Sequence, residues 1–147
     1  MHFAKVFLSA MISAPATREN VMHKDDAMAI AFEAKNMTLD ELAAKYVVFV
    51  QLCENTPYHI PDKPMAFNRL LHASMGVSTE AAELLDALKK EMFGKNKQLS
   101  MMNIKEELGD LLYYVTLAMQ VCDLTFQDLI ADNVIKLANR YIERFEV

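Results

Sequence analysis

Apolar positions recur at helical spacing through three long segments in the second half of the chain. Residues 65–91, 100–122 and 125–144 each carry apolar side chains three and four positions apart, which is typical of amphipathic α-helices. The 147 residues include only three Gly and four Pro, so there are few sites at which a helix would break. The pattern predicts an all-α fold built as a helical bundle.

The first 60 residues follow a less regular pattern. A short helix is predicted over 24–36, and Thr38 and Glu41 have the spacing of a capping box. The segment that follows, 42–53, has helical spacing, although its YVVFV run would also suit a strand. Three of the four prolines fall within 55–64. This break predicts an N-terminal extension, 1–60, that packs on the body of the protein or on a partner chain.

Helix starts in the main body, 61–147, are marked by polar residues. Ser100 would cap one helix, or Asn103 would do so with Glu106 in a capping box, and Thr125 would cap the last helix. The first sixteen residues loosely imitate a signal peptide, but their basic region is thin and their apolar run is short. No apolar stretch reaches the roughly 20 residues that span a membrane. We therefore expect a cytoplasmic protein without membrane contact.

Composition narrows the function classes further. Apolar residues make up 53% of the chain and charged residues 24%, which is typical of a globular domain. The net charge of −5 and the lack of a basic run argue against binding a nucleic-acid polymer, whereas a small anion would still bind beside cations. Cys53 and Cys122 form no spacing motif, so we expect two reduced, partly buried thiols.

Two acidic pairs are the most informative feature of the chain. Glu80 and Glu83 lie three residues apart on one predicted helix, and Glu107 and Asp110 repeat the spacing on the next. At about 100° per residue each pair lies along one edge of an apolar stripe. If the helices pack side by side, the four acids meet at the rim of a buried seam, where carboxylate oxygens suit Mg²⁺. The alternative is two solvated helix faces.

Further polar residues share these helix edges. Arg69, His72 and Gly76 extend the edge of Glu80, and Gly76 would leave room for a ligand. An ordinary surface Arg and a hydrogen-bonded His are the alternatives. The last helix carries an apolar stripe with a polar edge beside it. This edge would suit phosphate oxygens, or it is simply a solvated face. The polar edge comprises Asn133, Lys136 and Arg140, and the expected core stripe comprises Ile130, Val134, Leu137, Ala138 and Tyr141.

These motifs, in this order, resemble the MazG-like all-α nucleoside triphosphate pyrophosphatases. The matching stretches are HASMGVSTEAAELLDALKK, EELGDLLYYV and NVIKLANR. The resemblance covers roughly residues 65–144, and nothing comparable covers residues 1–60. It implies that 61–147 is a catalytic domain that hydrolyses a (deoxy)nucleoside triphosphate to the monophosphate and pyrophosphate.

The resemblance also implies roles for individual residues. Glu80, Glu83, Glu107 and Asp110 would be the catalytic acids that bind Mg²⁺, with Mn²⁺ as a substitute, and Glu106 would be a neighbouring acid. Tyr114 would lie by the sugar or base, or else be a core tyrosine. Phosphates would meet Asn133, Lys136 and Arg140, with Arg69 and His72 as further substrate contacts. Homodimers or homotetramers are implied as well.

Three rival functions remain open from the sequence. A di-iron carboxylate bundle would need a His three residues after a motif acid, and neither acidic helix has one. A phosphoribosyl-ATP pyrophosphohydrolase would share the acidic helices but would lack the long extension. A silent module that binds a partner protein would account for the eleven Met and for the first 60 residues. The preferred base, the number of metal ions and the general base stay open.

Overall fold

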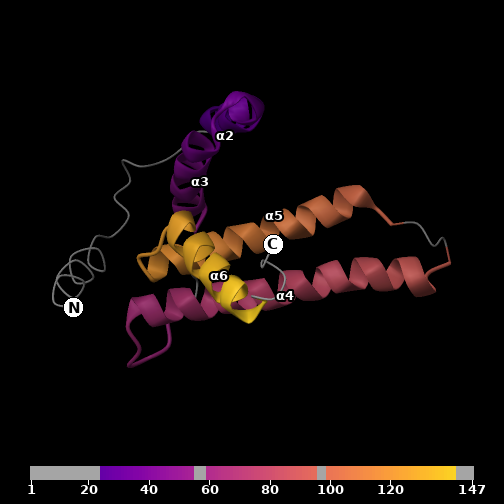
Figure 1. Cartoon of the computed structure of the whole chain (residues 1–147). Helices are drawn as coiled ribbons and strands as arrows, with labels where there is room; N and C mark the ends of the chain where they lie inside the picture. Colours follow the sequence, from indigo (N-terminus) through magenta and orange to yellow (C-terminus); the bar gives the residue numbers. More distant parts are fainter. Residues whose placement is uncertain (1–23, 55–58, 96–98, 142–147) are drawn as a thin grey trace.

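A computed structural model describes residues 24–54, 59–95 and 99–141 of the chain (Figure 1). Within these ranges the chain forms α-helices and one short 3-10 helix, without any strand. They are α2 (Lys24–Glu33), η1 (Ala34–Asn36), α3 (Leu39–Cys53), α4 (Met65–Phe93), α5 (Met101–Val121) and α6 (Phe126–Arg140). The all-α prediction is confirmed. The segment that resembles a signal peptide lies outside the described residues.

The two longest helices, α4 and α5, form an antiparallel hairpin that makes up the body of the molecule (Figure 1). The other helices gather toward the open end of this hairpin, where α3 packs on α5. Helix α2 lies beyond the start of α3, and α6 follows α5 after a turn through Asp123, whose φ is 53°. None of the described helices combines the length and apolar character needed to cross a membrane.

Local sequence signals set the helix ends, with two exceptions. Thr38 and Glu41 form the expected capping box, and Thr125 forms another with Asp128. Helix α5 is capped by Ser100, whose hydroxyl accepts a hydrogen bond from the Asn103 amide at 3.2 Å, so the alternative cap at Asn103 is wrong. Helix α6 ends at Arg140 instead of Arg144, because Tyr141 has left the helical region with φ −120°.

The YVVFV run lies within α3 and is helical, because it forms part of the face that α3 presents to the hairpin. Val50 of this run is buried with Ala73 of α4 and Leu117 of α5. The partly buried residues packed against this cluster are Tyr46, Tyr113, Tyr114 and Ala118. The core is therefore small and lies where α3, α4 and α5 meet.

Much of the predicted apolar stripe on α4 and α5 is not buried within one chain. Leu88 is 43% exposed and Leu108 is 51% exposed. The buried positions of α4 are instead Asn68 and the small residues Ala73, Gly76 and Ala87. Small side chains allow the closest approach of two helices, so α4 buries its small residues in the hairpin and leaves larger ones such as Leu88 partly exposed.

Helix α6 departs furthest from its expected packing. Ile130 is 62% exposed and Val134 is 59% exposed, and no residue of α6 is buried against the rest of the described chain. The expectation of a core stripe is therefore wrong for a single chain. The expected partial burial of the cysteines is also wrong, since Cys53 and Cys122 are both exposed and free.

Candidate metal centre

Three acidic side chains converge on one side of the α4–α5 hairpin. Glu80 comes from α4, and Glu107 and Asp110 come from successive turns of α5. One carboxylate oxygen from each lies within 4.8 Å of the other two. The i,i+3 spacing places Glu107 and Asp110 on one helix face, and the antiparallel hairpin brings Glu80 opposite them.

Glu107 is the most buried member of this acidic cluster, at 8% exposure. The Asn103 side-chain amide donates a hydrogen bond of 3.2 Å to its Oε1 atom. This contact joins positions four apart on α5, which face the same side of a helix. A buried carboxylate is thereby held in one orientation, as a preorganised ligand requires.

The acids repel one another in the absence of a cation. Burial raises the pKa of Glu80, and the neighbouring charges of Glu83, Asp110 and Glu107 raise it further. The nearest partner of Lys90 is Asp86, 2.8 Å from its ammonium, and Asp86 is the main cause of the raised pKa of Lys90, with smaller contributions from Glu83 and Glu107. A divalent cation would relieve this repulsion.

The donor set fits a hard cation. Carboxylate oxygens are the ligands that Mg²⁺ prefers, at about 2.0–2.1 Å from the ion. Two ligands of one such ion lie at most about 4.2 Å apart, so the oxygens, now within 4.8 Å of one another, would have to draw closer on binding. The cluster therefore suits Mg²⁺ better than a soft metal, which would favour sulfur or nitrogen ligands.

The fourth acid of the motif and the neighbouring Glu106 are placed differently. Glu83 is exposed and is not one of the three converging residues, although its charge reaches Glu80. Glu106 is also exposed and lies outside the cluster. Of the two adjacent glutamates on α5, the structure thus brings Glu107 into the cluster.

An aromatic side chain borders the acids. The ring of Tyr114 lies on the α4 backbone at Gly76, where an added Cβ would overlap it. The expectation that Gly76 leaves room for a ligand is wrong, because the ring fills that space. Burial raises the pKa of Tyr114, and Glu80 and Asp110 raise it further, so the phenol stays neutral beside the acids. His72 meets the ring edge-on, with centroids 5.8 Å apart.

Arg69 pairs with an acid from another helix. Its Nε and Nη2 atoms donate hydrogen bonds of 2.7 and 2.6 Å to the two carboxylate oxygens of Glu54, the residue that follows α3. Such a two-pronged pair is among the stronger side-chain interactions. Any contact of Arg69 with a substrate would have to come from Nη1 or from the second hydrogen of Nη2, since the edge formed by Nε and Nη2 is engaged by Glu54.

The predicted phosphate contacts on α6 are not brought to the acids within one chain. Asn133, Lys136 and Arg140 are all exposed. Among the described residues, neither Lys136 nor Arg140 contributes to the charges that shift the pKa of Glu80. The structure thus unites three of the ten predicted site residues in a cluster, with Tyr114 and His72 beside it.

Sequence reasoning missed three residues around this site. Asn103, which orients Glu107, was detectable from its position one turn before the acid. Glu54 and Tyr46 come from outside the acidic helices, and no local spacing relates them to the motif. Tyr46 has its pKa raised by burial and then by Asp110, so its ring lies within electrostatic reach of the acids.

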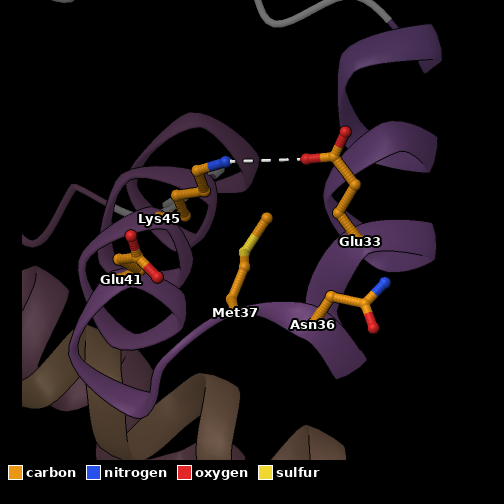
Figure 2. A pocket seen from close by; sticks show the side chains of 5 residues that line it. All are labelled: Glu33, Asn36, Met37, Glu41 and Lys45. Carbon is orange, nitrogen blue, oxygen red and sulfur yellow. Dashed lines mark ion pairs between the residues drawn. The ribbon is translucent and has the colours of Figure 1, made fainter.

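Away from the acidic cluster, a hollow of about 340 Å³ lies between α2 and α3 (Figure 2). Glu33 and Lys45 form an ion pair of 4.0 Å across it. Glu41 belongs to the capping box, and hydrogen bonds from Thr38 hold its pKa below the usual value. Because its charged groups are committed to pairing and capping, this hollow is a weaker candidate for a ligand site than the acidic cluster.

A comparison with known protein families supports the resemblance that the two acidic helices suggest. A family model of the MazG nucleotide pyrophosphohydrolase domain matches residues 71–145. The match takes in most of α4 and all of α5 and α6, and it leaves α2 and α3 outside. No curated protein and no solved structure matches the chain.

Proposed function

The chain belongs to the family of MazG nucleotide pyrophosphohydrolase domains, and from this premise we propose that it hydrolyses a (deoxy)nucleoside triphosphate to the monophosphate and pyrophosphate with Mg²⁺. The observation that carries the proposal is the approach of Glu80, Glu107 and Asp110 to within 4.8 Å of one another. The proposed catalytic domain is 61–147, preceded by the extension 1–60.

The acids have a shared task in this reaction. Glu80, Glu107 and Asp110 hold the metal, and Glu83 joins them as a fourth ligand after a rotation of its exposed side chain. Bound Mg²⁺, or Mn²⁺ in its place, offsets the charge of the triphosphate and makes a bound water more acidic. The hydrogen bond from Asn103 to Glu107 keeps one ligand in place while the others adjust.

The chemistry is a hydrolysis of the α–β phosphoanhydride. Water adds to phosphorus, the bridging P–O bond breaks, and the water's proton passes to a carboxylate acting as general base. The bridging oxygen leaves with one of the two products, the monophosphate or pyrophosphate. One of the four acids takes this proton.

Substrate contacts come from the helix edges beside the acids. Tyr114 and His72 meet the nucleoside end, and Arg69 reaches the substrate through its remaining N–H groups while it stays bound to Glu54. Asn133, Lys136 and Arg140 meet the phosphates. Because these three residues are exposed on α6, and neither Lys136 nor Arg140 contributes to the raised pKa of Glu80, the proposal has a second copy of the chain supply them.

A homodimer or homotetramer therefore forms the complete site. The exposed apolar side chains of α6, among them Ile130 and Val134, provide the contact surface. An apolar face of this kind on an otherwise polar helix commonly marks an interface. The assembled enzyme would work in the cytoplasm, on nucleotides and not on nucleic-acid polymers.

A nucleotide panel tests the proposal. The purified protein is incubated with each ribo- and deoxyribonucleoside triphosphate and with phosphoribosyl-ATP, in Mg²⁺ and again in Mn²⁺, and released pyrophosphate is measured. We expect release from at least one nucleoside triphosphate and none when the metal is chelated. Release from phosphoribosyl-ATP alone would reassign the substrate, and no release from a folded protein would favour the protein-binding module.

A further inference from the structure

The chain has three glycines, and the structure gives a packing reason for two of them. The ring of Tyr114 occupies the space at Gly76, and the carbonyl oxygen of Lys90 lies against Gly94 at the end of α4, so a side chain would collide at both positions. Gly109 differs from both. Apart from its own helix backbone and its two chain neighbours, no atom in the described part of the chain lies within 4 Å of where its Cβ would be.

Gly109 also lies at an unfavourable place for a glycine. It is an exposed residue well inside α5, which runs from Met101 to Val121. Glycine is the weakest helix former after proline, so almost any other residue would stabilise the helix here. Glycine is favoured inside an element where a ligand or another chain must come close to the backbone. Contacts within the described chain do not require this glycine, so a molecule outside the chain is its natural explanation.

The position of Gly109 relates it to the acidic cluster. It lies between Glu107 and Asp110 along α5 and is therefore level with the converging carboxylates. Burial within the cluster is graded, because Glu107 is buried, Glu80 is partly buried and Asp110 is exposed. The cluster is thus open to solvent on the side of Asp110, and Gly109 adjoins Asp110 about 100° around the helix. A molecule that reaches an ion in the cluster from this side passes close to Gly109.

We infer that the bare backbone of α5 at Gly109 is the surface over which the phosphate chain of the substrate lies when it reaches the metal centre. The inference rests on the proposed function. It adds the direction from which the phosphates approach, which the positions of the metal ligands do not give by themselves. The contribution of Gly109 is the space left by its missing side chain.

The surroundings of Gly109 favour phosphates over the two other occupants. The nucleoside end is proposed to meet Tyr114, which lies more than one turn further along α5. A second copy of the chain would pack less well here, because Lys105 and Glu106, one turn before Gly109, are both exposed and charged. Charged side chains are depleted at the centre of protein interfaces. The part of the substrate that is level with the acids is the phosphate chain.

Two substitutions of increasing size test the inference. Gly109→Ala and Gly109→Leu should both raise the stability to urea, because both residues form helices better than glycine, and both should weaken the binding of phosphates. The probe is inorganic tripolyphosphate with Mg²⁺, measured by calorimetry. Its Kd should rise at least about fivefold in Gly109→Ala, as overpacking at a contact predicts, and binding should be lost in Gly109→Leu. The Kd for Mg²⁺ alone should not change.

Ala82→Leu is the matched control for added bulk. Ala82 is exposed on α4, two residues after Glu80 and therefore about 200° around the helix from it. The same side chain is thus added on the side of the hairpin helix that faces away from the acids. Its Kd for tripolyphosphate should stay within twofold of the value for the unaltered protein.

Three results would overturn the inference. The first is an unchanged affinity of Gly109→Leu for tripolyphosphate. The second is an equal loss of affinity for Mg²⁺ alone, because the substitution would then act on the metal ligands and not on the phosphates. The third is dissociation of an oligomer by Gly109→Leu, seen by light scattering, which would assign the open space to a second copy of the chain.

The release of pyrophosphate from nucleotides decides the proposed function separately. If the unaltered protein hydrolyses nucleotides while Gly109→Leu binds tripolyphosphate normally, only the phosphate path is refuted. If no nucleotide is hydrolysed but the affinities change as expected, the proposed function fails and the phosphate path stands. If the unaltered protein neither hydrolyses nucleotides nor binds tripolyphosphate with Mg²⁺, both are refuted.

Discussion

The ring of Tyr114 on α5 lies directly on the α4 backbone at Gly76, at a position where any Cβ would overlap the ring. This contact lies one turn before Glu80 on α4 and one turn after Asp110 on α5. The closeness of the two helices at the acidic cluster therefore depends on a residue without a side chain. The contact sets the spacing of the three converging acids as well as the packing of the hairpin.

Gly76→Ala should destabilise the protein and weaken Mg²⁺ binding. Alanine normally improves a helix by about 1 kcal/mol over glycine, but here the overlap with Tyr114 would cost about 1–3 kcal/mol, as overpacking usually does. Gly109→Ala is the control, because its Cβ would meet nothing within 4 Å. Urea denaturation should show a lower stability for Gly76→Ala and an equal or higher one for Gly109→Ala. Equal gains in both variants would contradict the packing described here.

Asp110→Asn should abolish turnover without harming the fold. The substitution removes one metal ligand and one of the mutually repelling charges, so stability without metal should be equal or higher. Glu106→Gln, on the same helix but outside the cluster, should keep most of its activity. The measurements are pyrophosphate release and thermal unfolding with and without Mg²⁺. Of the two variants, only Glu106→Gln should have its Tm raised by Mg²⁺. Normal turnover by Asp110→Asn would refute the site.

Glu80→Gln should stabilise the metal-free protein in a pH-dependent way. The folded protein raises the pKa of Glu80, so its contribution to stability is fully present below the unfolded value, near 4.5, and is lost as pH rises through the folded pKa. The Gln side chain of the variant does not ionise, so the variant does not lose stability in this way as the pH rises. Its Tm should match that of the unaltered protein in acid and exceed it at neutral pH with chelator present. A difference that is constant with pH would contradict the assigned repulsion.

Ile130→Glu should disrupt assembly. Ile130 is exposed on the apolar stripe of α6, and a charge there would be buried in the proposed interface at a large cost. Asn139→Glu places the same charge on an exposed position of the opposite face of α6, away from that stripe. Light scattering after gel filtration should give a monomer for Ile130→Glu and an oligomer for Asn139→Glu and the unaltered protein. A monomeric unaltered protein would remove the basis for a shared interface.

Mixed oligomers would test whether one chain completes the site of another. Asp110→Asn and Arg140→Gln should each be inactive alone. When they are co-expressed, half of the sites in a mixed dimer would combine intact acids with an intact Arg140, so activity should return. Two separately purified and unmixed samples serve as the control. If activity does not return in confirmed mixed oligomers, Arg140 acts within its own chain.

Local features of the protein were predictable from its sequence. The capping boxes at Thr38 and Thr125, the long helices and the pairing of Glu107 with Asp110 on one face all depend on residues within about one or two turns. Even the convergence of Glu80 with the acids of α5 was predictable, because both helices carry acids three residues apart beside an apolar stripe and a short connector joins them. Helical periodicity is a local property, so the sequence determines it.

Tertiary packing decided the rest. The ring of Tyr114 fills the space at Gly76, Glu54 binds Arg69, and Tyr46 of α3 packs on the core shared with α4 and α5, although no spacing rule links these residues. Side-chain periodicity indicates which faces of a helix are apolar, but the rotation of one helix against another depends on how closely their backbones approach. Small residues allowed that approach on one face of α4. Parts of the apolar stripes, Leu88 and Leu108 among them, were thereby left exposed, together with an α6 that has no fully buried residue in the described part of the chain.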